Sequence, residues 1–253
     1  VKLARFGTRQ PEEPDYATAL QAIGPAAIKL GQALATRPDL VGEKAAHNLL
    51  TLQDSLPPAP FHLIRESVEK ALEAPLDKLF IEFDEVPVGA ASIAQVHRAV
   101  TTEGRQVAVK VLRPGIEEEF ATALETYEWA AAHLETHGGD EAVRLRPQMV
   151  IAHFRQWTRR ELDLNREAAS ASELKQNMVA EPGFYVPDID WKRTSRRVMT
   201  LEWLDGIKLS KRDELLAAGH NPRDLAAILV RAFLRQAVID GFFHADLHQG
   251  NLF

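Results

Sequence analysis

Four polar side chains near the end of the chain have the types and spacing to hold a metal–phosphate group. They are His244, Asp246, His248 and Asn251, within the stretch HADLHQGN. A rigid loop that presents a carboxylate and a carboxamide in this way could bind Mg²⁺ and nucleotide phosphates. The first three also alternate along an extended chain and could instead ligate zinc. The choice depends on a phosphate-covering loop, a lysine and a carboxylate partner for that lysine elsewhere in the chain.

A suitable lysine lies in a strand predicted over 106–112. One face of this strand consists of Val107, Val109 and Val111. Lys110 lies on the other face with Ala108 and Leu112, which are apolar too. A lysine on a strand buried on both faces is unusual, so one interpretation is that it binds a negative group. The other is an edge lysine, or one whose amine reaches solvent past its buried stem.

A run of small residues, Val88–Ile93, lies between strands predicted over 79–86 and 94–100. A turn at 101–105 then leads to the strand of Lys110. The sequence thus predicts a meander of short strands with a small-residue turn inside it.

The carboxylate partner is expected on a helix predicted over 148–176. Asp163 and Glu167 are four residues apart and would share a face. Glu161 would lie about 120° round the helix from Glu167. One regular helix cannot aim all three at one point, so at least two different contacts are implied. The alternative is an exposed acidic surface.

Further helices are predicted before and after this central region. Those before it, following a polar arm at 1–15, cover about 23–36, 43–53 and 61–73. The first should bury a face made of Ile23, Ala27, Leu30 and Leu34. Lys29 and Gln32 lie opposite, where periodicity alone predicts exposure. After a strand at 198–201 and a turn at 202–206, a last helix begins at Asn221-Pro222; it is apolar on most sides, which predicts a buried helix.

Composition excludes several classes of protein. The net charge of −6 gives no reason to expect a nucleic-acid partner. The absence of cysteine excludes disulfides and thiolate metal sites. No stretch resembles a signal peptide. The most apolar segment, 225–243, is interrupted by Arg231, Arg235, Gln236 and Asp240, so no membrane span is predicted. Because the chain begins without Met and stops within a pattern, we expect it to be a piece of a longer protein.

The order of these features resembles that of protein kinases, and in particular the UbiB family of atypical kinase-like proteins, which is linked to ubiquinone biosynthesis. The matching segments are Lys29-Leu-Gly31-Gln32, Gly89-Ala-Ala-Ser92, Val107-Ala-Val-Lys110, Glu161-Leu-Asp163 with Asn165-Arg-Glu167, and His244–Asn251. Each motif alone is weak, but five in the same order are specific. The resemblance implies an α+β protein-kinase-like fold with a family-specific N-terminal helical extension and a truncated C-terminal lobe.

The resemblance also implies a role for each matching residue. Lys110 would bind ATP or ADP phosphates, with Glu167 as its partner and Asp163 as the second choice. Asp246 takes the place of the catalytic-loop aspartate and Asn251 that of the first Mg²⁺ ligand. His244 and His248 would brace that loop. The remaining nucleotide contacts are expected from the Ala-rich loop and the turn after the last strand: Gly89, Ala90, Ala91, Ser92, Glu202 and Leu204.

The resemblance also implies a position for the KxGQ helix of the N-terminal extension. In the UbiB family the KxGQ helix packs over the site and blocks a peptide substrate, so Lys29 and Gln32 should point inward, in contrast to the periodicity prediction. Lys29 should then lie near Glu161, and Asp163 should belong to the same group of residues, which we call the gate.

The Ala-rich loop restricts backbone angles that glycine would allow, and in the UbiB family it goes with weak or absent protein phosphorylation. Because many members have a larger residue where Gly89 stands, the nucleotide preference is open.

The resemblance implies an ATP-binding protein with ATPase activity, or with kinase activity on a small molecule or lipid precursor, that supports ubiquinone (2-polyprenylphenol) biosynthesis. Its partners would be lipid or quinone precursors and quinone-biosynthesis proteins. The full-length protein would lie in the cytoplasm, in peripheral contact with the bacterial inner membrane. The expected domains are a helical extension (1–78), a kinase-like N-lobe with inserted helices (79–204) and the start of a C-lobe (205–253). The alternatives are a small-molecule phosphotransferase of the aminoglycoside or choline kinase type, a nucleotide-switched pseudokinase scaffold, and a zinc hydrolase.

The second Mg²⁺ ligand of a kinase-like site should follow Asn251 by about a dozen or more residues, beyond Phe253. We therefore expect residues 1–253 alone to be poorly stable or inactive. An ATPase assay with Mg²⁺ checks this, and full turnover by this chain would contradict it.

Overall fold

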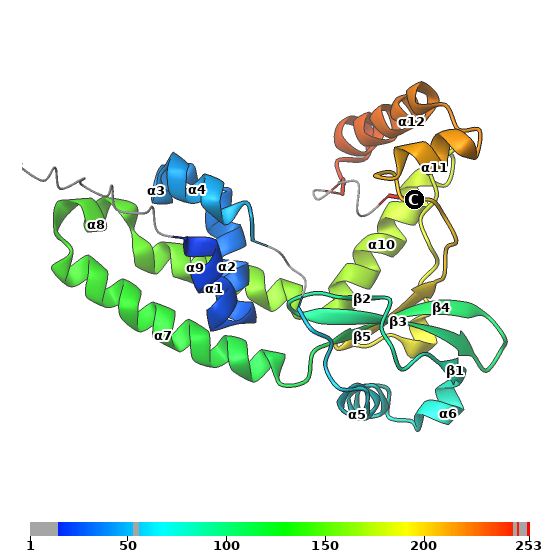
Figure 1. The fold of residues 1–253 in the computed structure, drawn as a ribbon, viewed down its shortest axis with the longest axis horizontal. Helices are drawn as coiled ribbons and strands as arrows, with labels where there is room; N and C mark the ends of the chain where they lie inside the picture. Colours follow the sequence, from blue (N-terminus) through cyan, green and yellow to red (C-terminus); the bar gives the residue numbers. More distant parts are fainter. Residues whose placement is uncertain (1–14, 53–55, 245–246, 248–251) are drawn as a thin grey trace, which may run out of the picture. The chain divides into compact units, whose positions relative to one another are not determined.

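The computed structural model describes residues 15–52, 56–244, 247 and 252–253. The chain forms two compact units, whose helices and strands are drawn in Figure 1. One unit combines Val1–Leu56 with Gly115–Trp157, and the other combines Pro57–Pro114 with Thr158–Phe253. The chain therefore passes between the units three times.

The first unit is helical. Its helices are α1 (Tyr16–Ile23), α2 (Pro25–Ala35), α3 (Pro38–Val41), α4 (Glu43–Leu49), α7 (Ile116–His137), α8 (Gly139–Leu145) and α9 (Pro147–Glu161), the last of which runs into the second unit. Gly24 separates α1 from α2 with a φ of +127°, a conformation that residues with side chains rarely adopt. The helix predicted from residue 23 therefore begins two residues later, and α1 was not predicted.

The predicted apolar face of α2 was wrong in part. Its buried residues are Ala26, Ala27, Ile28, Gly31 and Ala35, whereas Ile23 is 69% exposed. Small residues on this face allow close helix packing. A Cβ added at Gly31 would lie 2.5 Å from Leu52 Cδ1 and 2.6 Å from Leu20 Cδ1. The glycine of the KxGQ motif thus has a packing reason within the helical unit itself.

The second unit contains an antiparallel sheet. Its strands are β1 (Phe80–Phe83), β2 (Gly89–Ala90), β3 (Ala94–Thr101), β4 (Gln106–Leu112) and β5 (Val198–Glu202). Their order is β1-β3-β4-β5, with β2 also paired to β3. The predicted strand positions are thus confirmed, except that the short helix α6 (Leu76–Leu79) takes the start of the first one.

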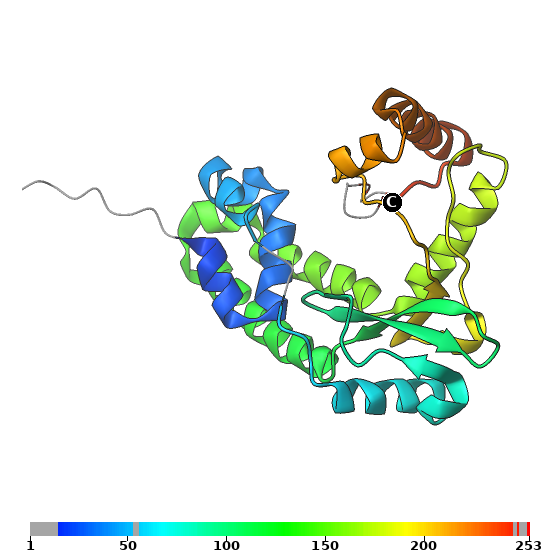
Figure 2. The same ribbon diagram turned by 45° about the vertical axis from the view of Figure 1, so that its right-hand side comes forward.

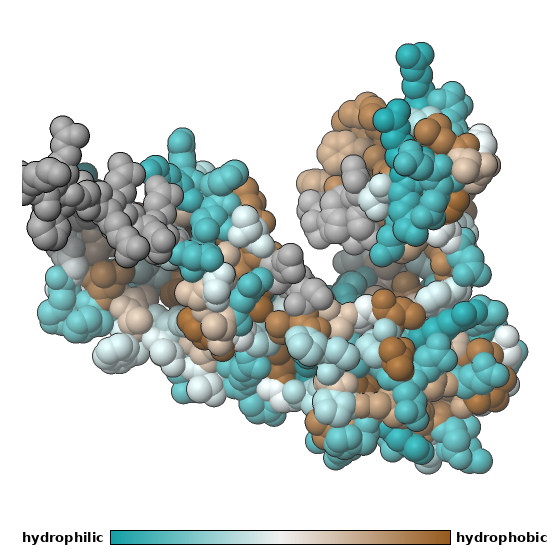
Figure 3. Space-filling view, in the orientation of Figure 1, coloured by the Kyte–Doolittle hydropathy of each residue, from teal (hydrophilic) through white to brown (hydrophobic). Residues whose placement is uncertain are grey.

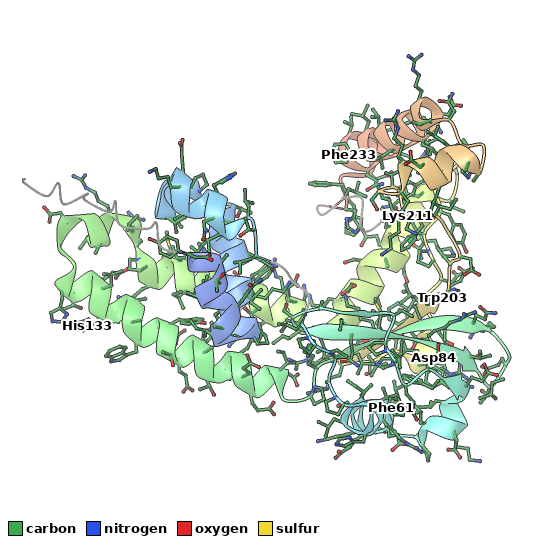
Figure 4. All side chains as sticks on the ribbon, in the orientation of Figure 1. Phe61, Asp84, His133, Trp203, Lys211 and Phe233 are labelled. Atoms are coloured by element: carbon green, nitrogen blue, oxygen red, sulfur yellow. The ribbon has the colours of Figure 1, made fainter. Side chains whose placement is uncertain are left out.

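The two faces of this sheet are covered differently. The valines at 107, 109 and 111 are at most 1% exposed and pack with Ile64 and Val68 of α5 (Phe61–Leu72). Figures 1 and 2 show α10 (Leu164–Met178) on the face opposite α5, and Figure 4 marks Phe61 at the start of α5. Since α5 completes the core of the sheet, the domain boundary expected between residues 78 and 79 falls inside this unit. The domain boundary expected between residues 204 and 205 also falls inside it.

The single helix predicted over 148–176 is wrong, because the chain breaks into α9 and α10. Leu162 and Asp163 lie between them, and Asp163 adopts an extended conformation with φ −131° and ψ 90° as the N-cap of α10. Asp163 and Glu167 therefore do not share a helical face. No glycine or proline marks this break in the sequence, and the N–H of Leu164 instead donates to Arg196 O at 2.9 Å.

The chain continues through η1 (Trp191–Arg193) to β5, and then through α11 (Arg212–Ala217), α12 (Pro222–Leu234) and the π-helix η2 (Arg235–Asp240). The Asn221 side chain caps α12 as predicted, accepting from Arg223 N at 3.0 Å. The expected burial of the last helix is not found. Large apolar side chains on it are exposed (Figures 3 and 4): Val230, Phe233, Leu234, Val238 and Ile239. Among the described residues, its fully buried apolar side chain is Ala232, which packs with Leu174, Met178 and Val186.

None of the helices in the described part of the chain is both long enough and apolar enough to span a lipid bilayer.

A fully buried arginine, Arg193, secures the end of the sheet at the β3–β4 turn. Its Nη1 donates to Asp190 at 2.9 Å and its Nη2 to Glu103 at 2.6 Å. Its Nε donates to the backbone oxygen of Leu79 at 2.7 Å. Asp190 is buried as well and also pairs with Arg105. The arginine was not singled out in the sequence, because its partners lie up to 114 residues away.

Arg193→Met should lower the free energy of unfolding by about 3 kcal/mol, because it leaves buried acceptors without their donor. Chemical denaturation of the natural full-length protein measures this. Lys192→Met is the matched control, since Lys192 also pairs with Glu103 but is largely exposed, and its loss should be much smaller. Equal effects of the two substitutions would contradict the interpretation.

Candidate functional site

The expected ion pair between Lys110 and Glu167 is present. Lys110 Nζ donates to both carboxylate oxygens of Glu167, at 2.7 Å and 2.8 Å. The two side chains remain 27% and 47% exposed. Of the two partners that the sequence allowed for Lys110, the contact is made by Glu167 and not by Asp163. The lysine is therefore held in a defined place and is still accessible to a ligand.

Strand alternation and helix position together produce this pair. Lys110 lies opposite Met199 of β5 and Val96 of β3, on the face of the sheet away from α5. Glu167 lies in the first turn of α10, where a carboxylate also interacts favourably with the helix dipole. Leu164 and Ala168 anchor this turn because both are fully buried.

A polar cluster fixes the rest of α10 against the segment before β5. Lys175 pairs with Asp188 at 2.6 Å and lies 4.9 Å from the ring centre of Tyr185. Burial alone would lower the pKa of Lys175, but Asp188 and Tyr185 outweigh it and raise this pKa. The Tyr185 hydroxyl donates to Glu202 at 2.5 Å, which raises the pKa of Tyr185. The helix that carries Glu167 is thus tied to the end of β5, a contact that the sequence analysis missed.

The Ala-rich loop lies at the same level of the sheet as Lys110. Gly89 pairs with Val96, which pairs on its other side with Lys110. Two strand spacings separate Gly89 from Lys110, or about 10 Å between their Cα atoms. A Cβ at Gly89 would meet nothing within 4 Å, so this position has room for a larger residue.

The other loop residues differ in accessibility. Ala90 and Ala91 are half-buried. Ser92 is fully buried, and its Oγ meets no hydrogen-bond partner within the described segments. A contact between this hydroxyl and a nucleotide would therefore require the loop to shift. The N–H of Ala91 is occupied as well, because it donates to Ala94 O at 2.8 Å.

The face that carries Lys110 has an apolar surface beside it. Ala108 and Leu201 lie opposite each other on β4 and β5, and Val96 lies one strand further on. All three are half-buried. Beyond them, the backbone N–H of Glu202 donates to Asp188 O at 2.8 Å and that of Trp203 donates to Gln106 O at 3.2 Å. The roles predicted for Glu202 and Leu204 in adenine binding stay predictions.

Asp246, His248 and Asn251 lie outside the described residues, so their predicted roles, and the zinc alternative, stay predictions. The start of their segment is described. The N–H of His244 donates to Gln236 Oε1 at 3.1 Å, and Gln236 is fully buried in η2. In the sequence, Gln236 interrupts an apolar segment. In the structure, its side chain fixes the backbone at His244, where the polar loop begins.

The expected gate involves both units. Lys29 and Gln32 are half-buried on α2 of the helical unit, whereas Glu161 and Asp163 belong to the second unit. The contact expected between Lys29 and Glu161 therefore stays a prediction. Asp163 Oδ1 is buried and meets no hydrogen-bond donor in the described parts of the chain. A buried carboxylate oxygen is stabilised by a donor or a cation, so this position suits a polar contact.

These features define an α+β protein-kinase-like fold with a lysine–glutamate pair on its sheet. A family model described as the ABC1 atypical kinase-like domain matches residues 51–253. The chain belongs to this ABC1 atypical kinase-like family, which confirms the predicted fold and the UbiB resemblance.

The chain is similar to proteins named "Probable protein kinase UbiB" from three bacteria. Identity is 43% over 235 residues for Marinobacter nauticus, 40% over 247 for Shewanella frigidimarina and 42% over 236 for Shewanella denitrificans. The matches cover 93%, 97% and 93% of this chain but only 43%, 45% and 43% of the relatives. The chain thus spans less than half the length of these curated relatives.

A solved structure, that of Rv3197 with erythromycin from Mycobacterium tuberculosis, is also similar. The TM-score is 0.65 at 26% identity, covering 93% of this chain and 59% of that one. The chain therefore belongs to a kinase-like class, and the sequence matches support its place as a UbiB-type protein.

Lys110→Met should change the free energy of unfolding by less than about 1 kcal/mol, because partly exposed ion pairs contribute little to stability. Chemical denaturation of the full-length protein measures this. A loss as large as that expected for Arg193→Met would show that the pair is mainly structural and would weaken the case for a ligand site.

Proposed function

We propose that this protein binds ATP or ADP with Mg²⁺ over the sheet face that carries Lys110, and acts as an atypical kinase-like ATPase or phosphotransferase. The observation that carries the proposal is the bidentate Lys110–Glu167 contact, at the same level of the sheet as the small-residue strand of the Ala-rich loop. Family membership supports the same class of activity.

The chemistry of a nucleotide explains why these groups belong together. Its phosphates are strongly negative, and a lysine held in place by a glutamate can meet them without reorganisation. The half-buried side chains of Val96, Ala108 and Leu201 offer an apolar surface on which a purine ring could pack. The Ala-rich loop would then lie on one side of the phosphates.

The metal requirement rests on the sequence, because Asp246 and Asn251 lie outside the described residues. Their carboxylate and carboxamide oxygens are donors that suit Mg²⁺. A bound Mg²⁺ would neutralise charge that develops on the phosphates. Asp246 would orient the group that attacks the terminal phosphate, and Lys110 would hold the phosphates in line for that attack.

For the acceptor, we propose a small molecule or lipid precursor of ubiquinone and not a protein. This rests on the resemblance to UbiB proteins and on the predicted gate formed by Lys29, Gln32, Glu161 and Asp163. A helix placed over the site would exclude a peptide while leaving room for water or a small acceptor. Such a precursor is apolar, so the full-length protein would act at the bacterial inner membrane.

Lys110→Ala should abolish the rise in melting temperature that Mg-ATP or Mg-ADP causes in the full-length protein, because it removes the charge that meets the phosphates. Thermal unfolding with and without nucleotide measures this. Lys192→Ala is the control, since Lys192 is an exposed lysine beside the β3–β4 turn. Unchanged stabilisation of the Lys110→Ala variant would count against the site.

Activity measurements separate the remaining alternatives. Phosphorylation of an amino alcohol or an aminoglycoside would favour a phosphotransferase of the choline or aminoglycoside kinase type. Nucleotide binding without turnover, even with membranes and a quinone precursor, would favour a nucleotide-switched scaffold. Stoichiometric zinc in the purified protein would favour a hydrolase.

A further inference from the structure

We infer that Arg113 is a positioning residue that sets the conformation of the Ala-rich loop, and thereby its selectivity between nucleotides. This rests on the proposed nucleotide site. Arg113 lies three residues after Lys110, just past the end of β4. Its side chain connects the loop to the segment Pro57–Pro60, which brings the chain from the KxGQ helices to the sheet.

The guanidinium of Arg113 holds two backbone carbonyl groups from distant parts of the chain. Its Nε donates to Ala91 O at 2.8 Å and its Nη2 donates to Pro57 O at 2.9 Å. Its own backbone N–H donates to Ile93 O at 2.9 Å. A planar guanidinium can hold two acceptors in a fixed geometry, whereas a lysine amine has no such fork. Arg113 therefore fixes the position of Ala91 relative to Pro57.

Pro57 is a fixed point because the segment that contains it is tied to the sheet independently. Ala59 N donates to Gln95 Oε1 at 2.8 Å. The amide of Gln95 donates to His97 Nε2 at 2.8 Å, so a neutral ring carries its proton on Nδ1, which lies 2.7 Å from Asp84 O. Figure 4 marks Asp84 beside the sheet.

Burial keeps this anchor in one state. Gln95 and His97 are both fully buried. Burial lowers the pKa of His97, which keeps the ring neutral as the hydrogen bonds require. Three prolines at 57, 58 and 60 further restrict the backbone of the anchored segment.

The Ala-rich loop depends on such support. Its strand β2 has two residues and pairs on one side with β3. Gly89 is exposed and has open space around its Cα. The guanidinium acts at the carbonyl oxygen of Ala91, two residues further on, whose N–H donates to Ala94 O at 2.8 Å at the tip of the β2–β3 hairpin. Loss of the hydrogen bond from Arg113 to Ala91 O would let the loop backbone move relative to Lys110. This movement would alter the contacts of the loop with the terminal phosphate of the nucleotide.

The test compares nucleotide binding by full-length Arg113→Met and Arg113→Lys proteins with the wild type. Dissociation constants for Mg-ATP and Mg-ADP are measured by calorimetry, and melting temperatures are recorded in parallel. Arg113→Met should change the ratio of the two constants by about tenfold, the worth of one charge-assisted hydrogen bond. Arg113→Lys, which keeps the charge without the fork, should lie between the wild type and Arg113→Met.

Arg105→Met is the matched control. Arg105 is also an arginine at an end of β3 and β4, but at the opposite end, where it pairs with Asp190 at 2.7 Å. General destabilisation would affect both nucleotides alike, so the ATP-to-ADP ratio of this variant should equal that of the wild type.

The outcomes separate this inference from the proposed function. Wild-type protein that binds neither nucleotide would overturn the proposed function itself. Wild-type binding with an unchanged ratio in Arg113→Met would overturn only the positioning role. If Arg113→Met does not fold, Arg113→Lys decides: a ratio equal to that of the wild type, at an unchanged melting temperature, overturns the inference, and a shifted ratio supports it.

Discussion

The contact between Lys110 and Glu167 is the constraint that the candidate site imposes on the second unit. The two residues are 57 positions apart, and one of the two segments of the helical unit, Gly115–Trp157, lies between them in the sequence. For the pair to form, β4 must present its lysine away from α5, and α10 must begin on that side of the sheet. The break between α9 and α10 at Leu162–Asp163 makes this start possible, because it resets the direction of the helix before Glu167.

The sheet is chemically asymmetric in a way that supports this pair. One face is sealed by α5, and the polar groups on it, Gln95 and His97, are paired and neutral. The other face keeps a charged pair half-open beside apolar side chains. Two arginines stabilise opposite ends of the same strands. Arg193 fixes the β3–β4 turn, and Arg113 holds the Ala-rich loop near the site.

The sequence predicts the parts of this arrangement that depend on local pattern. The alternation of valines correctly predicted that Lys110 lies on the face of the sheet opposite Val107, Val109 and Val111. The order of the motifs correctly predicted the kinase-like class. Features set by distant partners were missed. The α9–α10 break has no glycine or proline, Arg193 bonds to Glu103 and to Leu79 O, and Arg113 bonds to Ala91 O and Pro57 O, all far away in the sequence. The last helix was expected to be buried because its composition is apolar, but composition does not say which side finds a partner.

The helical unit is built from two separate chain segments, and part of the sheet unit lies between them in the sequence. The helical unit is therefore not a contiguous piece of the chain. Its early helices cannot be transplanted without α7–α9, and α7–α9 cannot be excised without cutting between β4 and α10. A single proteolytic cut cannot release the unit, and a single recombination event cannot add it to another kinase-like sheet.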